Sequence, residues 1–551
     1  MPETLPLSPR RQLLAGTAAL TTLAVLPLPG LRGQATAATE ALVETTHGKL
    51  RGSASEGVLS FKGIPYAASP AGAARFNPPA ALAPWVGERE ATTHGASAPQ
   101  LRGASLPMFS YSSSSSPQSE DCLSLCVYTT GLRDGRRRPI LVWLHGGAWS
   151  TGAGTSPVLD GSALAREQDV VVVAVNHRLN LFGFLQAESL PPGAGNNGVL
   201  DMVAALRWMR DNAETFGGDP GCVTIFGQSG GAAKVSAMMA APAARGLFHR
   251  AIMESGSGAL RLATPEDAAR AAHGLLTEFE LRPTDAARLR DIPAERLLAA
   301  MAKVVAANGG ANNFRPVLDG VVFQQHPFDT AAPAPVREVP LLIGSAETEV
   351  TFYLAPDPKN FALDTAQVRA RVQRFLRLDA AATDQVLAGY RAALPAASPS
   401  DLLVAICSDQ NYRMGMIQAA ELQAKADGAP AWLYLFTWRS PAMGGTLRTP
   451  HTAELPFVFG NLDSAAEFTG HGNELPAVRR RMMELWATFA RTGRPGAPDV
   501  PNWPSYDGSS RPTMLLGTDA RLAQDPGGAE RQALRQVPRF EYSHPVTFTR
   551  D

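Results

Sequence analysis

The chain has 551 residues, with 50 basic and 50 acidic side chains, so its formal net charge at pH 7 is zero. That balance lacks the positive excess typical of a nucleic-acid-binding protein. With 45% hydrophobic and 18% charged residues, the chain is also too apolar to be intrinsically disordered. No segment resembles a linker between two globular halves, so we expect one large, core-rich domain.

The N-terminal residues resemble an export signal. Arg10 and Arg11 precede a weakly hydrophobic stretch that reaches Leu28, and small residues follow at 35–38. Paired arginines before such a stretch are typical of twin-arginine signals. We therefore expect residues 1–38 to be a signal peptide and the protein to be secreted or periplasmic. The alternative is a membrane anchor, against which the threonines and prolines of the stretch argue. No later segment is long and apolar enough to span a membrane, so we expect no span in the mature protein.

The mature chain, residues 39–551, begins with strand signals. Residues 139–144 and 170–175 are short, almost wholly apolar runs, which are typical of parallel strands buried on both faces. A helical pattern follows at 198–216, then a short strand at 223–226 and a helix of small residues at 232–241. Strand and helix alternate in this order, which indicates an α/β fold.

The later segments are mainly helical in pattern. Residues 265–307 and 365–394 carry Ala, Leu and Arg at helical spacing, which predicts helices packed on the sheet or capping its mouth. Residues 431–438 return to strand character. The serine run at 112–116 predicts a mobile surface loop.

The four cysteines predict no zinc site. Cys122 and Cys126 lie in a strand-like run, where four residues span about 13 Å, too far for a mutual disulfide. Outside the cytoplasm the four cysteines could form disulfides in three possible pairings, and buried free thiols are the default expectation.

One motif carries a nucleophile. Gly227-Gln228-Ser229-Gly230-Gly231 matches G-x-S-x-G, and it stands between a predicted strand and a predicted helix. A serine on that tight turn adopts a strained backbone, and the flanking glycines let strand and helix approach closely. The context predicts Ser229 as a nucleophile.

A second motif predicts an oxyanion hole. Attack by a serine creates an oxyanion that needs hydrogen-bond donors. The run His145-Gly146-Gly147-Ala148-Trp149 follows the strand that ends at Leu144, and its glycines let backbone N–H groups turn toward an anion. An ordinary strand-to-loop turn is the alternative. We expect the donors to be the N–H groups of Gly147, Ala148 and Gly230.

The chain resembles the type-B carboxylesterases, the family that includes the cholinesterases. The resemblance rests on blocks that include FKGIPYA at 61–67, SEDCL at 119–123, FGGDP at 216–220 and ELPFVFG at 454–460. Such blocks run in the family's order over nearly the whole mature chain. The resemblance implies an α/β-hydrolase fold: a central, mostly parallel sheet flanked by helices, with helical insertions around an active-site gorge.

The resemblance also implies the other members of a Ser-Glu-His triad. The acid is a glutamate after the strand at 340–344, where Glu347 and Glu349 compete; periodicity cannot separate them, and the family spacing favours Glu349. The base must follow in the chain, which leaves His451, His471 and His544. His451 stands before the ELPFVFG block as the family's histidine does, so we expect it to be the base and the other two to be surface residues.

Three departures from the family pattern concern the substrate. Gln228 replaces the usual glutamate, Ala148 replaces a glycine, and the tryptophan that cholinesterases have before the SEDCL block is missing. A quaternary ammonium needs an aromatic face and benefits from an anion, so a choline ester is not the expected substrate. Relatives also have a cysteine near residues 98–100 that pairs with the counterpart of Cys122; without it, that disulfide cannot form.

The sequence therefore predicts a serine carboxylesterase for small-molecule esters with short to medium acyl or aryl groups, and it implies no metal or organic cofactor. The rival from another class is a catalytically inactive, cholinesterase-like binding protein. Within enzymes the rivals are an amidase, a lipase, and a detoxifying esterase for a polyester metabolite. The sequence leaves the oligomeric state open.

Overall fold

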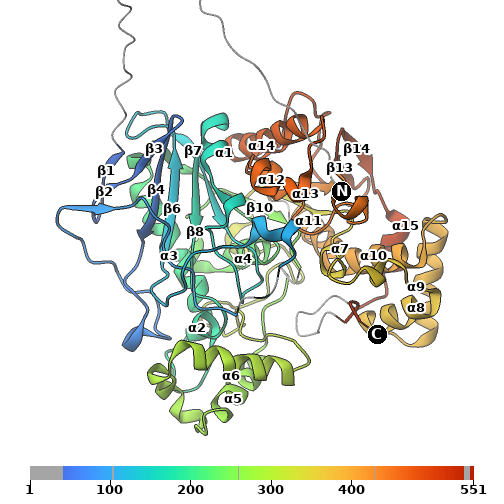
Figure 1. Cartoon of the computed structure of the whole chain (residues 1–551), viewed down its shortest axis with the longest axis horizontal. Coiled ribbons are helices and arrows are strands. Elements are labelled where there is room, and N and C mark those ends of the chain that lie inside the picture. The colour runs from blue at the N-terminus through green and yellow to red at the C-terminus, as the bar shows by residue number, and fades with distance from the viewer. Residues whose placement is uncertain are drawn as a thin grey trace, which may run out of the picture. The chain divides into compact units, whose positions relative to one another are not determined.

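The computed structural model describes residues 41–101, 103, 105–257, 260–426, 428–538 and 547–550. The predicted signal peptide lies outside these residues. The described part of the mature chain forms one compact unit built on a large central sheet (Figure 1).

The central sheet has 11 strands in the order β14-β13-β12-β11-β10-β9-β7-β8-β6-β4-β3. The strands from β8 across to β13 are parallel, and antiparallel strands extend the sheet at both edges. The strands are β3 (Ser53–Ser55), β4 (Val58–Pro65), β6 (Ser124–Thr129), β7 (Arg138–Leu144), β8 (Val171–Val175), β9 (Gly218–Gln228), β10 (Arg250–Glu254), β11 (Leu341–Ala346), β12 (Ala431–Phe436), β13 (Pro512–Leu516) and β14 (Ala520–Gln524). A separate small sheet contains β1 (Leu42–Thr45), β2 (Gly48–Arg51) and β5 (Glu88–Glu90).

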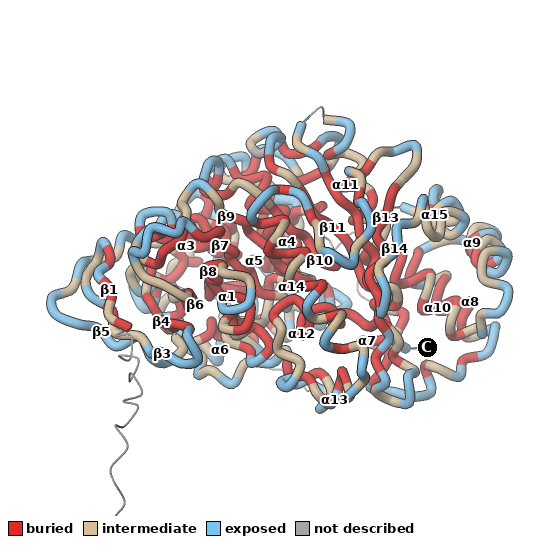
Figure 2. Tube along the Cα trace, turned by 90° about the horizontal axis from the view of Figure 1, so that it is seen from above, coloured by how far each residue is buried: buried red, intermediate tan, exposed pale blue. Residues whose placement is uncertain are grey.

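Helices cover both faces of the central sheet because its strands are apolar on both sides. Along β7, Ile140 and Val142 pack in one cluster with side chains of α3 (Asn197–Asn212), α4 (Gly230–Ala240) and α11 (Met414–Ala424). Leu141 and Trp143 point the other way, toward α1 (Ser162–Gln168), α12 (Leu455–Val458) and α14 (Leu475–Thr492). This alternation is the period of two expected of a strand. Figure 2 shows the buried residues concentrated along these strands.

The other helices form two groups away from the central strands. The first contains α5 (Pro265–Thr277) and α6 (Ala294–Ala307), which pack with side chains of α2 (Asn180–Phe184) in a cluster of their own. The second group lies at the right in Figure 1, and its apolar side chains form a further cluster. It contains α7 (Thr351–Leu354), α8 (Thr365–Leu376), α9 (Ala380–Ala393), α10 (Pro399–Ser408) and α15 (Gly528–Ala533). The short helix α13 (Ala466–Thr469) packs near α12.

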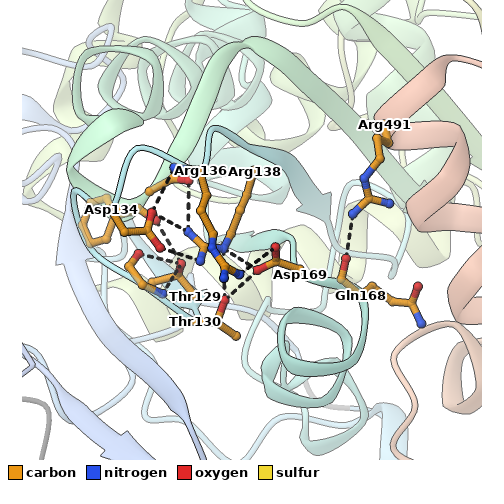
Figure 3. Close-up of polar contacts among 11 residues, drawn as sticks. Thr129, Thr130, Asp134, Arg136, Arg138, Gln168, Asp169 and Arg491 are labelled. Atoms are coloured by element: carbon orange, nitrogen blue, oxygen red, sulfur yellow. Dashed lines mark hydrogen bonds and ion pairs between the residues drawn. The ribbon is translucent and has the colours of Figure 1, made fainter.

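A polar network holds the amino end of β7. The Arg138 side chain, 2% exposed, donates to Asp134 and to Asp169 at 2.6 Å each (Figure 3). Arg491 of α14 donates to the carbonyl of Gln168, where α1 ends, at 2.8 Å. These contacts lie at the opposite end of β7 from the segment predicted to hold an oxyanion.

The structure contains elements predicted from the sequence, but their first and last residues differ from the prediction. The predicted helix at 198–216 is α3 followed by a single 3-10 turn, Glu214–Phe216, and the predicted strand at 223–226 is part of the longer β9. The four cysteines are free thiols, as expected, although Cys222 is half-buried rather than buried. Among the described helices, none is long and apolar enough to cross a membrane.

Candidate active site

Ser229 stands on a strained turn. β9 ends at Gln228 and α4 begins at Gly230, so Ser229 is the single residue between strand and helix. Its φ of 61° and ψ of −124° are unusual for a residue with a Cβ. Its N–H donates to the carbonyl of Glu254 at 2.8 Å, which ties the turn to the neighbouring strand β10. Strain of this kind persists only where the surroundings hold it.

The glycines after Ser229 are required by close packing. A Cβ on Gly231 would lie 2.1 Å from the carbonyl oxygen of Leu144, the last residue of β7. A Cβ on Gly230 would lie 2.3 Å from the Cα of Ala148. The first turn of α4 therefore touches the segment after β7 backbone to backbone. The N–H of Gly230, in that first turn, has no partner within the helix.

His451 and Glu349 form a buried pair. His451 Nδ1 lies 2.6 Å from Glu349 Oε2, and the two side chains are 3% and 0% exposed. The other carboxylate oxygen, Oε1, accepts from the N–H of Ala346 at 2.8 Å. An ionised carboxylate only accepts hydrogen bonds, so it holds the imidazole hydrogen on Nδ1, and Nε2 of the neutral ring then carries the lone pair that can accept a proton.

The alternative residues lie elsewhere. β11 ends at Ala346 and the chain then turns, so Glu347 and Glu349 diverge instead of sharing the face that an extended segment would give them. Glu347 is partly exposed and pairs with Arg439 at 3.3 Å. His471 is exposed, and His544 lies outside the described residues.

A cavity of about 660 Å³ brings the predicted residues together. Ser229, His451, Gly147, Ala148 and Gly230 all line it, and Glu349 supports His451 from behind. The rest of its described wall is made of hydroxyl, amide, aromatic and small apolar side chains, with no Asp, Glu, Lys or Arg among them. This wall therefore combines apolar side chains with hydroxyl and amide groups and carries no formal charge.

The serine run at 112–116 is part of this cavity rather than a loop free of contacts. Ser112, Ser113 and Ser114 line it. The hydroxyl of Thr155 lies 2.7 Å from that of Ser114 and 2.9 Å from that of Ser116. A serine-rich composition predicts exposure, but it does not show that two of the hydroxyl groups share Thr155 as a hydrogen-bond partner.

The contacts of the His451 ring with its neighbours were not predicted from the sequence. Tyr412 and Tyr353 lie 4.7 and 5.9 Å from it between ring centroids, and their hydroxyls are 2.5 Å apart. Tyr412 belongs to a π-helical turn, Asp409–Arg413, that joins α10 to α11. Gln228 Nε2 lies 3.3 Å from both ring nitrogens. A π-helical turn has no distinct sequence pattern, and such turns are frequent at functional sites.

The segment between β7 and Trp149, predicted to hold the oxyanion donors, turns sharply through two successive residues. Gly147 and Ala148 have φ values of 87° and 53°, both in the left-handed region. Behind them, His145 stacks on His177 with 4.9 Å between ring centroids. Burial and the nearby Lys234 lower the pKa of both histidines well below the usual range, so both are neutral near pH 7.

Two further carboxyl groups are buried behind the site. Glu254 and Glu454 are both 0% exposed. Burial raises the pKa of Glu254 to about 8. Burial and the neighbouring Glu254 also raise the pKa of Glu454 well above its ordinary value. Trp486 donates to Glu254 Oε1 at 2.8 Å. Among the described residues, no group of three or more His, Cys, Asp or Glu side chains is placed to hold a metal ion.

A mostly parallel sheet with a strained serine turn after one of its strands defines an α/β hydrolase. Residues 39–534 match the model of the carboxylesterase family, and the chain belongs to that family. It is thus a carboxylic ester hydrolase.

Named relatives agree with this family. The chain is 36% identical to the para-nitrobenzyl esterase of Bacillus subtilis (strain 168) over 511 residues, which cover 90% of this chain and 99% of the relative. It is 32% identical to the phenmedipham hydrolase of Pseudarthrobacter oxydans, in an alignment that covers 91% of this chain and 100% of that relative. The crystal structure of a Geobacillus stearothermophilus carboxylesterase superposes with a TM-score of 0.78 at 38% identity, and the match covers 90% of this chain and 99% of that chain.

Proposed function

We propose that this carboxylesterase acts through an acyl-enzyme on Ser229, with His451 as general base and Glu349 as the partner of the histidine. The observation that carries the proposal is the 2.6 Å bond between Glu349 and His451 at the wall of the cavity into which Ser229 opens. Nucleophile, base and orienting acid are the three parts that this chemistry needs.

In the proposed reaction, His451 Nε2 takes the hydroxyl proton of Ser229 as the oxygen attacks the ester carbonyl. Glu349 keeps the imidazole in the required tautomer and stabilises its positive charge. The N–H groups of Gly147, Ala148 and Gly230 stabilise the oxyanion of the tetrahedral intermediate. The alcohol leaves with the proton from His451, and water releases the acid by the same steps in reverse.

The lining of the cavity favours uncharged esters as substrates, and we propose that they are of short to medium length. Moving a charged acyl group from water into a site without a counter-charge is costly, and the described wall offers hydroxyl and amide groups instead of charged ones. Esters whose acyl part carries a free carboxylate should therefore react more slowly than neutral esters of equal length. We also propose that residues 1–38 direct export, which N-terminal sequencing of protein recovered outside the cytoplasm would test.

The test is hydrolysis of p-nitrophenyl butyrate by the wild type and by Ser229→Ala. We expect kcat of the variant to fall by several orders of magnitude. Ser236→Ala is the matched control, because Ser236 is a buried serine on the same helix α4 and does not line the cavity. Equal hydrolysis by wild type and Ser229→Ala would exclude Ser229 as the nucleophile.

Two further measurements separate the rival functions. A folded wild type that neither turns over nor reacts with a fluorophosphonate would favour the binding protein. A series of p-nitrophenyl esters from acetate to laurate, beside a p-nitroanilide, distinguishes an esterase from a lipase and an amidase.

A further inference from the structure

A lysine is buried in the helix that carries the nucleophile. Lys234 is the fifth residue of α4 and is 0% exposed. Its Nζ donates to the carbonyl oxygens of His145 and Ala148, at 2.7 Å each. It also lies 5.4 Å from the ring centroid of Trp149. All three contacts are with the segment that follows β7.

This lysine has an unusual environment. Buried lysines are rare unless they are paired with a carboxylate. Burial lowers the pKa of Lys234 well below the ordinary value, and no described carboxylate forms an ion pair with it. The two carbonyl groups are its polar contacts. An ammonium and a neutral amine both have enough N–H groups to serve both carbonyls, so these contacts do not depend on the charge.

The two carbonyls mark the ends of the segment that holds the proposed oxyanion donors. Gly146 and Gly147 lie between them, and the N–H of Ala148 belongs to the same stretch. Ala148 has a φ of 53° although it carries a Cβ, a conformation that is strained for alanine. Such strain persists only where neighbouring groups impose it. Lys234 binds the carbonyl of this strained residue directly.

We propose that Lys234 is a positioning residue for the oxyanion hole. Its amino group joins the two ends of residues 145–148 and so holds the N–H groups of Gly147 and Ala148 toward the reacting oxygen. The lysine does not touch the substrate; it acts through the backbone that does. This inference rests on the proposed function, because it assigns a role in stabilising the oxyanion formed by attack of Ser229.

The first test is Lys234→Met, which keeps an unbranched side chain of similar length and removes the donors. Oxyanion donors act mainly in the transition state, so we expect kcat for p-nitrophenyl butyrate to fall about 10- to 100-fold while KM changes less than about twofold. An aryl trifluoromethyl ketone, which forms an oxyanion on the serine, should lose affinity by a similar factor. A role in stability alone would leave the kcat of the folded enzyme unchanged.

The second test uses the strain at Ala148. Glycine adopts the left-handed conformation without the cost that alanine bears. In Ala148→Gly, residues 145–148 adopt their conformation with less strain and depend less on the hydrogen bonds from Lys234. Lys234→Met should therefore lower kcat by a smaller factor in the Ala148→Gly background than in the wild-type background. The double-mutant cycle isolates this coupling, because residue 148 and Lys234 are in contact.

Ser236→Ala, which removes another buried polar group of α4, is the control and should keep its kcat. Rates are divided by the number of sites titrated to completion with a fluorophosphonate, so that misfolded protein is not counted. Lys234→Met with kcat within twofold of wild type overturns the proposal, and so does an equal loss in both backgrounds. An inert wild type, or a Ser229→Ala variant as active as wild type, overturns the proposed function and this inference together.

Discussion

Glu254 should make the protein less stable as the pH rises, and Glu254→Gln should remove that loss. Glu254 is fully buried at the end of β10 with Glu454 and Tyr434 nearby. Its pKa is about 8 in the folded protein, against an ordinary value of 4.5. Below pH 4.5 the carboxyl group is protonated in both the folded and the unfolded state, and it does not disfavour folding.

Between pH 4.5 and about 8, the unfolded chain loses this proton while the folded protein keeps it. The unfolded state then binds fewer protons, so the free energy of unfolding decreases with rising pH. At about 1.4 kcal/mol per pKa unit, a difference of this direction and size corresponds to a loss on the order of a few kcal/mol by pH 8. Glutamine does not ionise, and its amide oxygen can still accept the Trp486 hydrogen bond.

We therefore expect Glu254→Gln to match the wild type near pH 4.5 and to become more stable than it as the pH approaches 8. Urea unfolding of both proteins at pH 5, 6.5 and 8 measures this margin. Glu295→Gln, at an exposed position in α6, controls for the loss of one carboxylate. A margin that stays constant over these pH values would show that ionisation of Glu254 does not change the stability of the fold.

Two more perturbations separate chemistry from stability. In Glu349→Gln, the amide oxygen should keep the hydrogen bond from the N–H of Ala346, and the NH₂ group should then face His451 and force the ring hydrogen onto Nε2. We therefore expect kcat to fall by about 10⁴-fold with KM little changed. A loss of kcat below about tenfold would count against the role of Glu349. Arg138→Met should lower the free energy of unfolding by about 2 to 3 kcal/mol, because it leaves Asp134 and Asp169 without their shared partner. Because β7 separates Arg138 from Leu144 by about 20 Å, Arg138→Met should leave kcat unchanged. Steady-state kinetics measure kcat, and urea unfolding measures the loss of stability.

Much of the fold could be predicted because its signals are local. The apolar runs at the positions of β7 and β8 predicted buried strands, and the G-x-S-x-G motif predicted the junction of β9 and α4. The resemblance to a known family supplied the order of the elements. Strand ends were less accurate: β9 begins five residues before the predicted strand, at Gly218, because its first residue pairs with Arg138 across the sheet.

The contacts around the site were harder to predict because they join distant parts of the chain. The choice between Glu347 and Glu349 depended on a turn after β11, which periodicity does not encode. Lys234 stood in a run of small residues, and only the packing of α4 against residues 145–148 shows that its amino group is enclosed. Tyr412 required a π-helical turn to reach the histidine ring.

The order of the site segments along the chain has a consequence for biosynthesis. The proposed oxyanion turn follows β7, Ser229 follows β9, Glu349 follows β11, and His451 comes after β12. A ribosome therefore makes the proposed nucleophile, Ser229, more than 200 residues before its proposed base, His451. Nascent or truncated chains that end before His451 would carry an unactivated serine. A reagent that reacts only with an activated serine would then count finished molecules, and so serve as a reporter of completed synthesis and folding.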